Sequence, residues 1–120
     1  MQRIVFILFI LFTVISSFRY YLEDEEKITW VTYYHDKFNG AKTSNGNIFD
    51  NSKYTAAHAS LPFGTKVLLT NLATSDTVTV TVNDRGARHK KRAFDITKAA
   101  FLRLGELRHG SLKVSYKIVE

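Results

Sequence analysis

The stretch Ala41–Arg85, AKTSNGNIFDNSKYTAAHASLPFGTKVLLTNLATSDTVTVTVNDR, decides how this chain folds and where its chemistry lies. Within it, Thr77–Val82 alternates strictly between valine and threonine, which predicts a β-strand with one buried face. Asp50, His58 and Asp84 each lie in or beside a turn, next to an apolar run. A carboxylate held at a strand end, half out of water, is how a small all-β protein obtains an acid with a shifted pKa. These three residues are therefore the first candidates for a site.

The segments on either side of this stretch predict further short elements. Thr97 can cap a helix that runs to Leu104 and ends at Gly105. β-branched and aromatic residues, or alternation of apolar with polar ones, predict strands at 28–34, 66–72, 92–96 and 112–119. Several short strands, one short helix and long loops favour a small closed barrel over an open sheet. The expected fold class is all-β.

The N-terminal region divides into two parts before the folded domain, which we expect to span residues 28–120. Arg3 precedes an apolar run from Ile4 to Ile15, and two serines follow it, which is the pattern of a secretory signal over residues 1–17. The alternative is a retained N-terminal anchor, although the run is shorter than the ~20 apolar residues of a spanning helix. Residues 18–27 form an acidic leader. The chain is thus expected to be exported to the periplasm or cell envelope, with membrane contact only if the N-terminal segment is retained.

Composition narrows the classes of partner and cofactor. The chain of 120 residues has no cysteine, so its core must be held without disulfides, and its formal net charge is +6. Outside the cytoplasm this charge favours an anionic cell-wall polymer over nucleic acid. The basic cluster between Arg85 and Arg92 is either part of the surface that meets such a polymer or simply a solvated loop. The four histidines lack the spacing of a metal site, and no Gly-rich phosphate loop is present, so neither metal nor cofactor is expected.

The residues alone leave the role of each candidate open. Asp50 and His58 could form a pair in which the carboxylate keeps the imidazole charged, or could be a turn cap and a core histidine. Asp84 could act in a site or only cap the turn that follows its strand. Asp95 could bond the N-terminus of the helix as a structural acid, or point across a groove as a second carboxyl.

Seven short pieces of the sequence carry a resemblance to a known family. In order they are KTSNG (42–46), FD (49–50), TAAH (55–58), LPFGT (61–65), the apolar strand 67–72, VNDRG (82–86) and FDIT (94–97). Together they closely resemble the rare lipoprotein A (RlpA-like) family, the septal-ring lytic transglycosylases, over residues 29–119. Two positions depart from the family pattern: Asn47 stands where many members carry Glu, and Ala87 replaces a proline after the Asp-Arg-Gly turn.

The resemblance implies both a fold and an activity. The fold would be a six-stranded double-psi β-barrel, also seen in expansins. The activity would be cleavage between N-acetylmuramic acid and N-acetylglucosamine in stem-free peptidoglycan strands, which leaves 1,6-anhydro ends during wall remodelling and daughter-cell separation. Septal-ring proteins would be partners. The rival hypothesis is a non-catalytic, expansin-like module that binds wall glycan, which Asn47 favours because an amide cannot donate a proton as an acid.

For the enzyme, we expect one carboxyl to serve as both acid and base, because the C6 hydroxyl of the substrate supplies the nucleophile. The catalytic candidates are Asp50, His58 and Asp84: either aspartate is the acid/base, and His58 orients it. The candidates for substrate binding are Asn47 (to an N-acetyl group), Tyr34 (stacked on a sugar), Arg85 with the basic loop (to lactyl carboxylates) and Asp95, which matches the aspartate that expansin-like barrels use as their acid.

Overall fold

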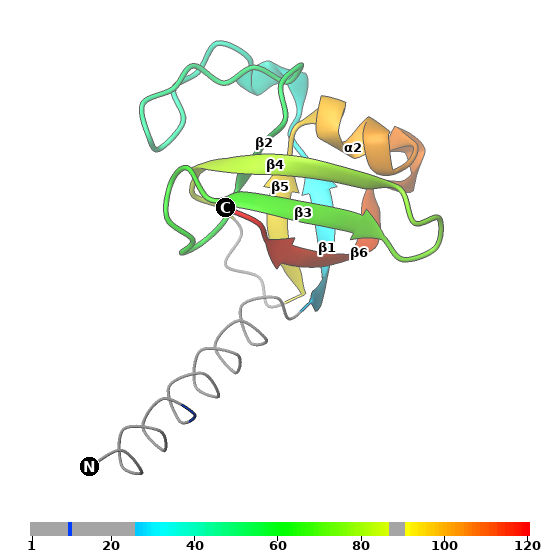
Figure 1. The fold of residues 1–120 in the computed structure, drawn as a ribbon. Helices are drawn as coiled ribbons and strands as arrows, with labels where there is room; N and C mark the ends of the chain where they lie inside the picture. The colour runs from blue at the N-terminus through cyan, green and yellow to red at the C-terminus, as the bar shows by residue number, and fades with distance from the viewer. Residues whose placement is uncertain (1–9, 11–25, 87–90) are drawn as a thin grey trace, which may run out of the picture.

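Six strands close into a single barrel in the computed structural model, which describes Ile10 and residues 26–86 and 91–120 (Figure 1). The order around the barrel is β1-β5-β2-β4-β3-β6. The strands are β1 (Lys27–Tyr33), β2 (Thr55–Ala57), β3 (Lys66–Asn71), β4 (Thr77–Asp84), β5 (Arg92–Ile96) and β6 (Ser111–Ile118). The helices are η1 (Asp36–Phe38), α2 (Lys98–Leu104) and η2 (Leu107–His109). The predicted all-β, six-stranded barrel with one short α-helix is confirmed.

The barrel is of mixed type. β1 pairs with β5, and β2 with β4, in parallel, whereas the other four pairings are antiparallel. Both parallel pairs carry a register shift: β5 has the extra residue Ala93 opposite Trp30 and Val31, and β4 has the extra residue Asn83 opposite Ala56 and Ala57. Such irregularities bend a strand and re-aim the side chains that follow them. In β4 the extra residue, Asn83, directly precedes Asp84.

The barrel interior is filled by the alternating apolar positions that the sequence predicted. Val78, Val80 and Val82 of β4 are all buried. Phe94 of β5 is fully buried and packs edge-to-face against Tyr116 of β6, with ring centroids 5.0 Å apart. Burying such side chains gives the apolar stabilisation that a disulfide-free domain of this size requires.

Helix α2 begins and ends where the sequence signals predicted. The Thr97 hydroxyl accepts a hydrogen bond from the Ala100 N–H at 3.3 Å, and Gly105 follows the last helical residue. Thr97 is fully buried and also donates to the Lys53 carbonyl, so the helix start is tied to the loop before β2. Phe101 lies on the buried face of α2 and contacts Tyr33, with ring centroids 4.8 Å apart.

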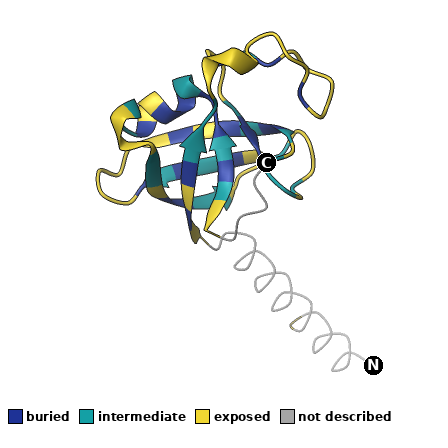
Figure 2. Ribbon diagram, turned by 180° about the vertical axis from the view of Figure 1, so that it is seen from behind, coloured by how far each residue is buried: buried dark blue, intermediate teal, exposed yellow. Residues whose placement is uncertain are grey.

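A long loop, residues 34–54, connects β1 to β2 and stands beside one end of the barrel, where Figure 2 shows it largely exposed. Asn51 anchors it. Its side-chain amide donates to Tyr34 O and Asp36 Oδ1, at 3.2 and 2.9 Å, and its Oδ1 accepts from Lys98 N at 2.8 Å. Asn51 is only 6% exposed, and its hydrogen bonds connect the long loop to the first turn of α2.

Three details differ from the sequence prediction. β2 was not predicted as a strand, because three residues are too few to show alternation. β4 extends two residues beyond the predicted Val82, to Asp84. In β6 the outward Ser115 is buried while Ile118 is 48% exposed, so the predicted apolar face is only partly inside.

The predicted signal or anchor (1–17), most of the acidic leader and part of the basic loop (87–90) lie outside the described residues. In the part of the chain that is described, no helix has the length and apolarity to cross a membrane.

Candidate functional site

Asp84 ends β4 and is surrounded by hydrogen-bond donors. Its Oδ1 accepts from Ser44 N (2.9 Å), Ser44 Oγ (2.6 Å) and its neighbour Arg85 N (2.9 Å), while its Oδ2 accepts from the Tyr34 hydroxyl (2.8 Å). Burial alone would raise the pKa of Asp84, but these hydrogen bonds outweigh it and hold the pKa below its ordinary value. Asp84 is therefore a fixed carboxylate at neutral pH.

Tyr34 directly follows β1 and lies between this carboxylate and the base of the long loop. Its ring packs against Phe49, with centroids 4.5 Å apart. Burial, followed by the hydrogen bond to Asp84 and the charges of Asp84 and Asp95, raises the pKa of Tyr34 well above its ordinary value. The phenol thus stays protonated and acts as a donor. The structure uses it to hold Asp84, and its predicted stacking on a sugar remains a prediction.

His58 follows β2 and is fixed through one ring nitrogen. Its Nδ1 accepts from the backbone N–H groups of Ser60 (3.1 Å) and Leu61 (3.0 Å), so in the neutral ring the proton is assigned to Nε2. The ring lies 4.8 Å from that of Phe94 between centroids. Burial and the charge of Arg85 lower the pKa of His58. Of the two alternatives for His58, the one in which a carboxylate keeps the ring charged is not observed, because the Nδ1 partners are backbone donors and the charge that shifts its pKa is that of Arg85.

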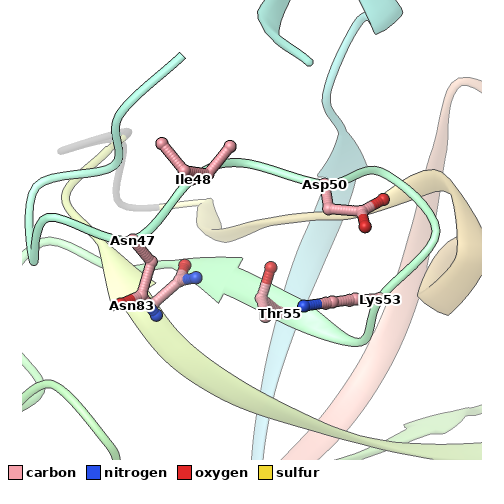
Figure 3. Close-up of a pocket in the computed structure, with 6 residues that line it drawn as sticks. All are labelled: Asn47, Ile48, Asp50, Lys53, Thr55 and Asn83. Atoms are coloured by element: carbon pink, nitrogen blue, oxygen red, sulfur yellow. The ribbon is translucent and has the colours of Figure 1, made fainter. Parts of the chain in front are cut away.

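Asp50 lies apart from this group, in a pocket of about 360 Å³ between the long loop and the outside of the barrel. Figure 3 shows its six lining residues: Asn47, Ile48, Asp50 and Lys53 from the loop, Thr55 from β2 and Asn83 from β4. Oδ1 of Asp50 accepts from Ser52 Oγ (2.6 Å) and Ser52 N (2.9 Å). These bonds lower the pKa of Asp50, so it too is ionised at neutral pH in the free protein.

The predicted site residues thus form two adjoining groups. Asp84 and His58 are joined through the backbone, since His58 N donates to Asp84 O at 3.1 Å. The Asp50 pocket adjoins them through Asn83, which precedes Asp84 and whose carbonyl accepts from Asn45 N at 3.2 Å. Among the described residues, no hydrogen bond links Asp50 to His58 or Asp84.

Asp95 turns away from the helix start. The first N–H groups of α2, from Lys98 and Ala99, donate to Asn51. Asp95 instead accepts from the Thr32 hydroxyl, and a Cβ added at Gly86 would lie 3.2 Å from its Oδ2. Of the two roles considered for Asp95, the structural acid at the helix N-terminus is thus not the one observed. Its carboxyl lies beside the turn that follows Asp84.

Arg85 braces the turns around His58. Its Nη1 donates to the carbonyls of Leu61 (2.7 Å) and His58 (3.3 Å), and its guanidinium carbon lies 4.0 Å from the centre of the Phe63 ring. The planar guanidinium suits this combined stacking and bonding. Its predicted contact with a lactyl carboxylate remains a prediction, as does the role of the loop that follows it.

Sequence reasoning did not select several residues that line the site or hold its carboxylates: Ser44, Ile48, Ser52, Lys53, Thr55 and Asn83. Ser44 was noticed only as part of a turn, yet it donates twice to Asp84, forty positions away. Nothing in the local pattern reports such a distant pairing. Within the described part of the chain, no cluster of His, Asp and Glu side chains is arranged to hold a metal ion.

The closed six-stranded mixed barrel, together with the family model that matches residues 29–116, places this chain among the double-psi β-barrels. The fold resembles that of the Streptomyces papain inhibitor (TM-score 0.66, 23% identity), covering 80% of this chain and 96% of that one. It also resembles a Clavibacter michiganensis expansin mutant solved in complex with cellohexaose (TM-score 0.63, 19% identity), covering 80% of this chain and 51% of the other. These likenesses concern the fold alone.

The chain belongs to the family described as "Lytic transglycolase", whose model matches residues 29–116. It is 48% identical over 86 residues to the "Probable endolytic peptidoglycan transglycosylase RlpA" of Treponema pallidum, covering 72% of this chain and 27% of that protein. It is 40% identical over 89 residues to the "Endolytic peptidoglycan transglycosylase RlpA" of Pasteurella multocida, covering 74% and 30%. The chain therefore spans less than a third of the length of these two relatives. The resemblance to the rare lipoprotein A family is confirmed.

Proposed function

We propose that this protein is a peptidoglycan lytic transglycosylase that cuts MurNAc–GlcNAc bonds in stem-free glycan strands and leaves 1,6-anhydro ends. The observation that carries the proposal is the family match over residues 29–116, within which Asp84 and His58 lie beside each other and the Asp50 pocket adjoins them through Asn83. The protein would act in the periplasm or cell envelope, in wall remodelling and daughter-cell separation, where septal-ring proteins would be its partners.

Asp50 is the residue best placed to be the acid/base. It lies in a pocket, and among the described residues only Ser52 hydrogen-bonds its carboxylate. A sugar bound over the pocket displaces water from the carboxylate, which raises its pKa and populates the protonated form. The protonated carboxyl gives its proton to the glycosidic oxygen as the C1–O bond breaks. The resulting carboxylate takes the C6 hydroxyl proton as O6 bonds to C1, which returns Asp50 to its starting state.

Asp84 and His58 would support this reaction without exchanging the proton. The fully hydrogen-bonded Asp84 stays ionised, so its negative charge stabilises the positive charge that develops at the anomeric carbon. His58, neutral and protonated at Nε2, would donate a hydrogen bond to a substrate oxygen. A fixed carboxylate and a fixed donor need no reorganisation at the moment of reaction.

The amides of Asn47 and Asn83 line the same pocket as Asp50. A side-chain amide offers both a donor and an acceptor, which matches the carbonyl and N–H of an N-acetyl group. Because Asn47 cannot ionise, the acid/base task in this pocket falls to Asp50.

Two observations favour the second candidate function, a glycan-binding module that does not cut. The pKa values of Asp50 and Asp84 are both lowered, so neither carboxyl is protonated at neutral pH in the free protein. Asn47 removes the acid that many members of the family carry at this position.

The test is release of anhydro sugars from purified stem-free glycan strands, followed by mass spectrometry, for wild-type protein, Asp50→Asn and Asp84→Asn. We expect Asp50→Asn to lower the rate by roughly 10²- to 10⁴-fold, the usual worth of a general acid/base. Glu120→Gln, a substitution at an exposed carboxyl that pairs with Lys66, is the matched control and should leave the rate unchanged. Unchanged release by both aspartate variants would overturn the residue assignment. Wild-type protein that co-sediments with glycan but releases no anhydro ends would establish the binding module instead.

A further inference from the structure

We propose that a second pocket, centred on Trp30, binds acidic sugar units of the same glycan and holds long strands on the protein. The inference rests on the proposed function for its ligand, a muramyl-type sugar with a free lactyl carboxylate. The pocket itself is independent of the Asp50 site.

The second pocket lies in a different part of the fold from the first. It has a volume of about 600 Å³, and its lining includes Trp30, Leu72, Thr74, His109, Leu112 and Lys113. These residues come from β1, the β3–β4 hairpin, η2 and β6, and none of them lines the Asp50 pocket. In Figure 1 the β3–β4 hairpin is at the right of the barrel, whereas the loop that carries Asp50 is at the upper left. A volume of this size is typical of small-ligand sites.

The floor of the Trp30 pocket is held by internal hydrogen bonds. Asn71, 6% exposed, donates from Nδ2 to Leu104 O at 2.7 Å and accepts at Oδ1 from Ala73 N at 2.9 Å. Leu72 N donates to Lys113 O at 3.3 Å, which fixes the hairpin to β6. The pocket is thus preformed, and a ligand need not order it.

The exposed side chains of the pocket suit a sugar. Trp30 is 39% exposed, and Leu72 is 47% exposed. Exposed apolar side chains that lie together around a pocket mark a binding surface more often than singly scattered ones do. An indole offers a flat apolar face to the C–H side of a pyranose ring and an N–H donor at its edge. Thr74 and His109 add polar groups for the sugar hydroxyls.

The charge around Trp30 selects an anionic ligand. In the strand register Trp30 lies between Arg92 of β5 and Lys113 of β6, both of which are exposed. No aspartate or glutamate occurs among the described residues that line the pocket. The carboxylate of Asp76 accepts from the hydroxyl of the lining residue Thr74 at 2.9 Å, but the two cations that flank the aromatic face outnumber it and attract a ring that carries negative charge.

Stem-free glycan has this chemistry. The lactyl carboxylate of a muramyl unit is free once the stem peptide is removed, and is an uncharged amide while the peptide is attached. A strand long enough to reach both pockets would bind more tightly than either pocket alone allows, because the second contact is intramolecular. The Trp30 pocket would thereby favour long, peptide-free strands.

The test uses the fact that Trp30 is the only tryptophan in the chain, so intrinsic fluorescence reports directly on this pocket. Wild-type protein is titrated with stem-free glycan strands, with N-acetylglucosamine oligomers of matched length, and with an acidic peptide of matched charge. We expect a saturable change in emission with the glycan and at least about fivefold weaker binding of the neutral oligomers and the peptide. Lys113→Glu should weaken glycan binding about five- to tenfold. The matched charge reversal Arg103→Glu, on the exposed side of α2, should leave it unchanged.

The outcomes separate this inference from the proposed function. Unchanged emission while the same protein co-sediments with glycan would overturn the Trp30 site. Equal responses to the acidic peptide and the glycan would overturn its assignment to sugar. A saturable emission change without release of anhydro ends would refute the catalytic proposal and leave the Trp30 site standing. Trp30→Ala should keep the rate of anhydro release on short soluble strands and lose affinity for long ones.

Discussion

Replacing Tyr34 by phenylalanine tests the idea that hydrogen bonds keep Asp84 ionised. The substitution removes the hydroxyl that donates to Asp84 Oδ2 at 2.8 Å and leaves the ring packed against Phe49. This hydroxyl lowers the pKa of Asp84, so its loss should move that pKa upward, toward the ordinary value.

The size of the effect follows from the kind of bond. A hydrogen bond to a charged group contributes about 1.5–3 kcal/mol, and partial exposure of Asp84 places this one toward the lower end, at about 1–2 kcal/mol. In a domain of this size each kcal/mol lowers Tm by roughly 4–8 °C. Because the folded pKa of Asp84 is lowered, its contribution is present above the unfolded pKa of about 3.9 and is lost as the pH falls through the folded value. The destabilisation by Tyr34→Phe should therefore be largest above about pH 4 and shrink in more acidic solution.

The neighbouring Tyr33 supplies the control. Its hydroxyl donates to a neutral acceptor, Leu107 O, at 3.1 Å, so Tyr33→Phe should cost about 1 kcal/mol or less at every pH and leave Asp84 alone. Urea unfolding at a series of pH values gives the stabilities, and ¹³C NMR of the side-chain carboxyls gives the pKa of Asp84. An unmoved pKa in Tyr34→Phe, or the same pH-dependent loss in both variants, would refute the reasoning.

Three further outcomes are expected. Asn51→Ala should lower the free energy of unfolding, measured in urea, by about 2–3 kcal/mol, because a buried amide with partners in the loop and at the start of α2 is lost. A loss below about 0.5 kcal/mol, the usual range for surface substitutions, would contradict the anchoring role of Asn51. By NMR titration His58 should have a pKa below 6.5, and Arg85→Gln should raise that pKa. Because the unfolded state takes up the proton first, the free energy of unfolding should decrease as the pH falls below 6.5. Gly86→Ala should lower stability and shift the turn or the Asp95 carboxyl, because the new Cβ would lie 3.0 Å from Ala57 Cβ and 3.2 Å from Asp95 Oδ2. An unchanged crystal structure with unchanged stability would contradict this expectation.

Local signals in the sequence predicted most of the scaffold. The valines of β4 alternate with threonines, and both faces are where that alternation places them. Thr97 and Gly105 set the ends of α2 to the residue, since capping depends on hydrogen bonds to the nearest turn. The three-residue β2 was not predicted because its sequence pattern is too short. Its place in the barrel is set by β4 and β5, which come later in the chain.

The site was less accessible to such reasoning. Turn chemistry singled out Asp50, His58 and Asp84, and the family resemblance grouped them, but neither reported their states of ionisation. Ser44 sets that of Asp84 from forty residues away, and Ser52 sets that of Asp50. For His58 the backbone N–H groups at Nδ1 and the nearby arginine favour the neutral ring, which only coordinates could show.

The position of β6 has a consequence for how the chain reaches this fold. β6, the last of the six barrel strands in chain order, lies between β1 and β3 and pairs Tyr116 with Lys27 on one side and with Leu69 on the other. Until residues 111–118 are available, β1 and β3 keep open edges and the barrel cannot close. Closure is then a late, long-range event, and contacts between such distant residues make folding slow. If the chain crossed a membrane pore from its N-terminal side, the barrel would stay open until residue 118 had emerged.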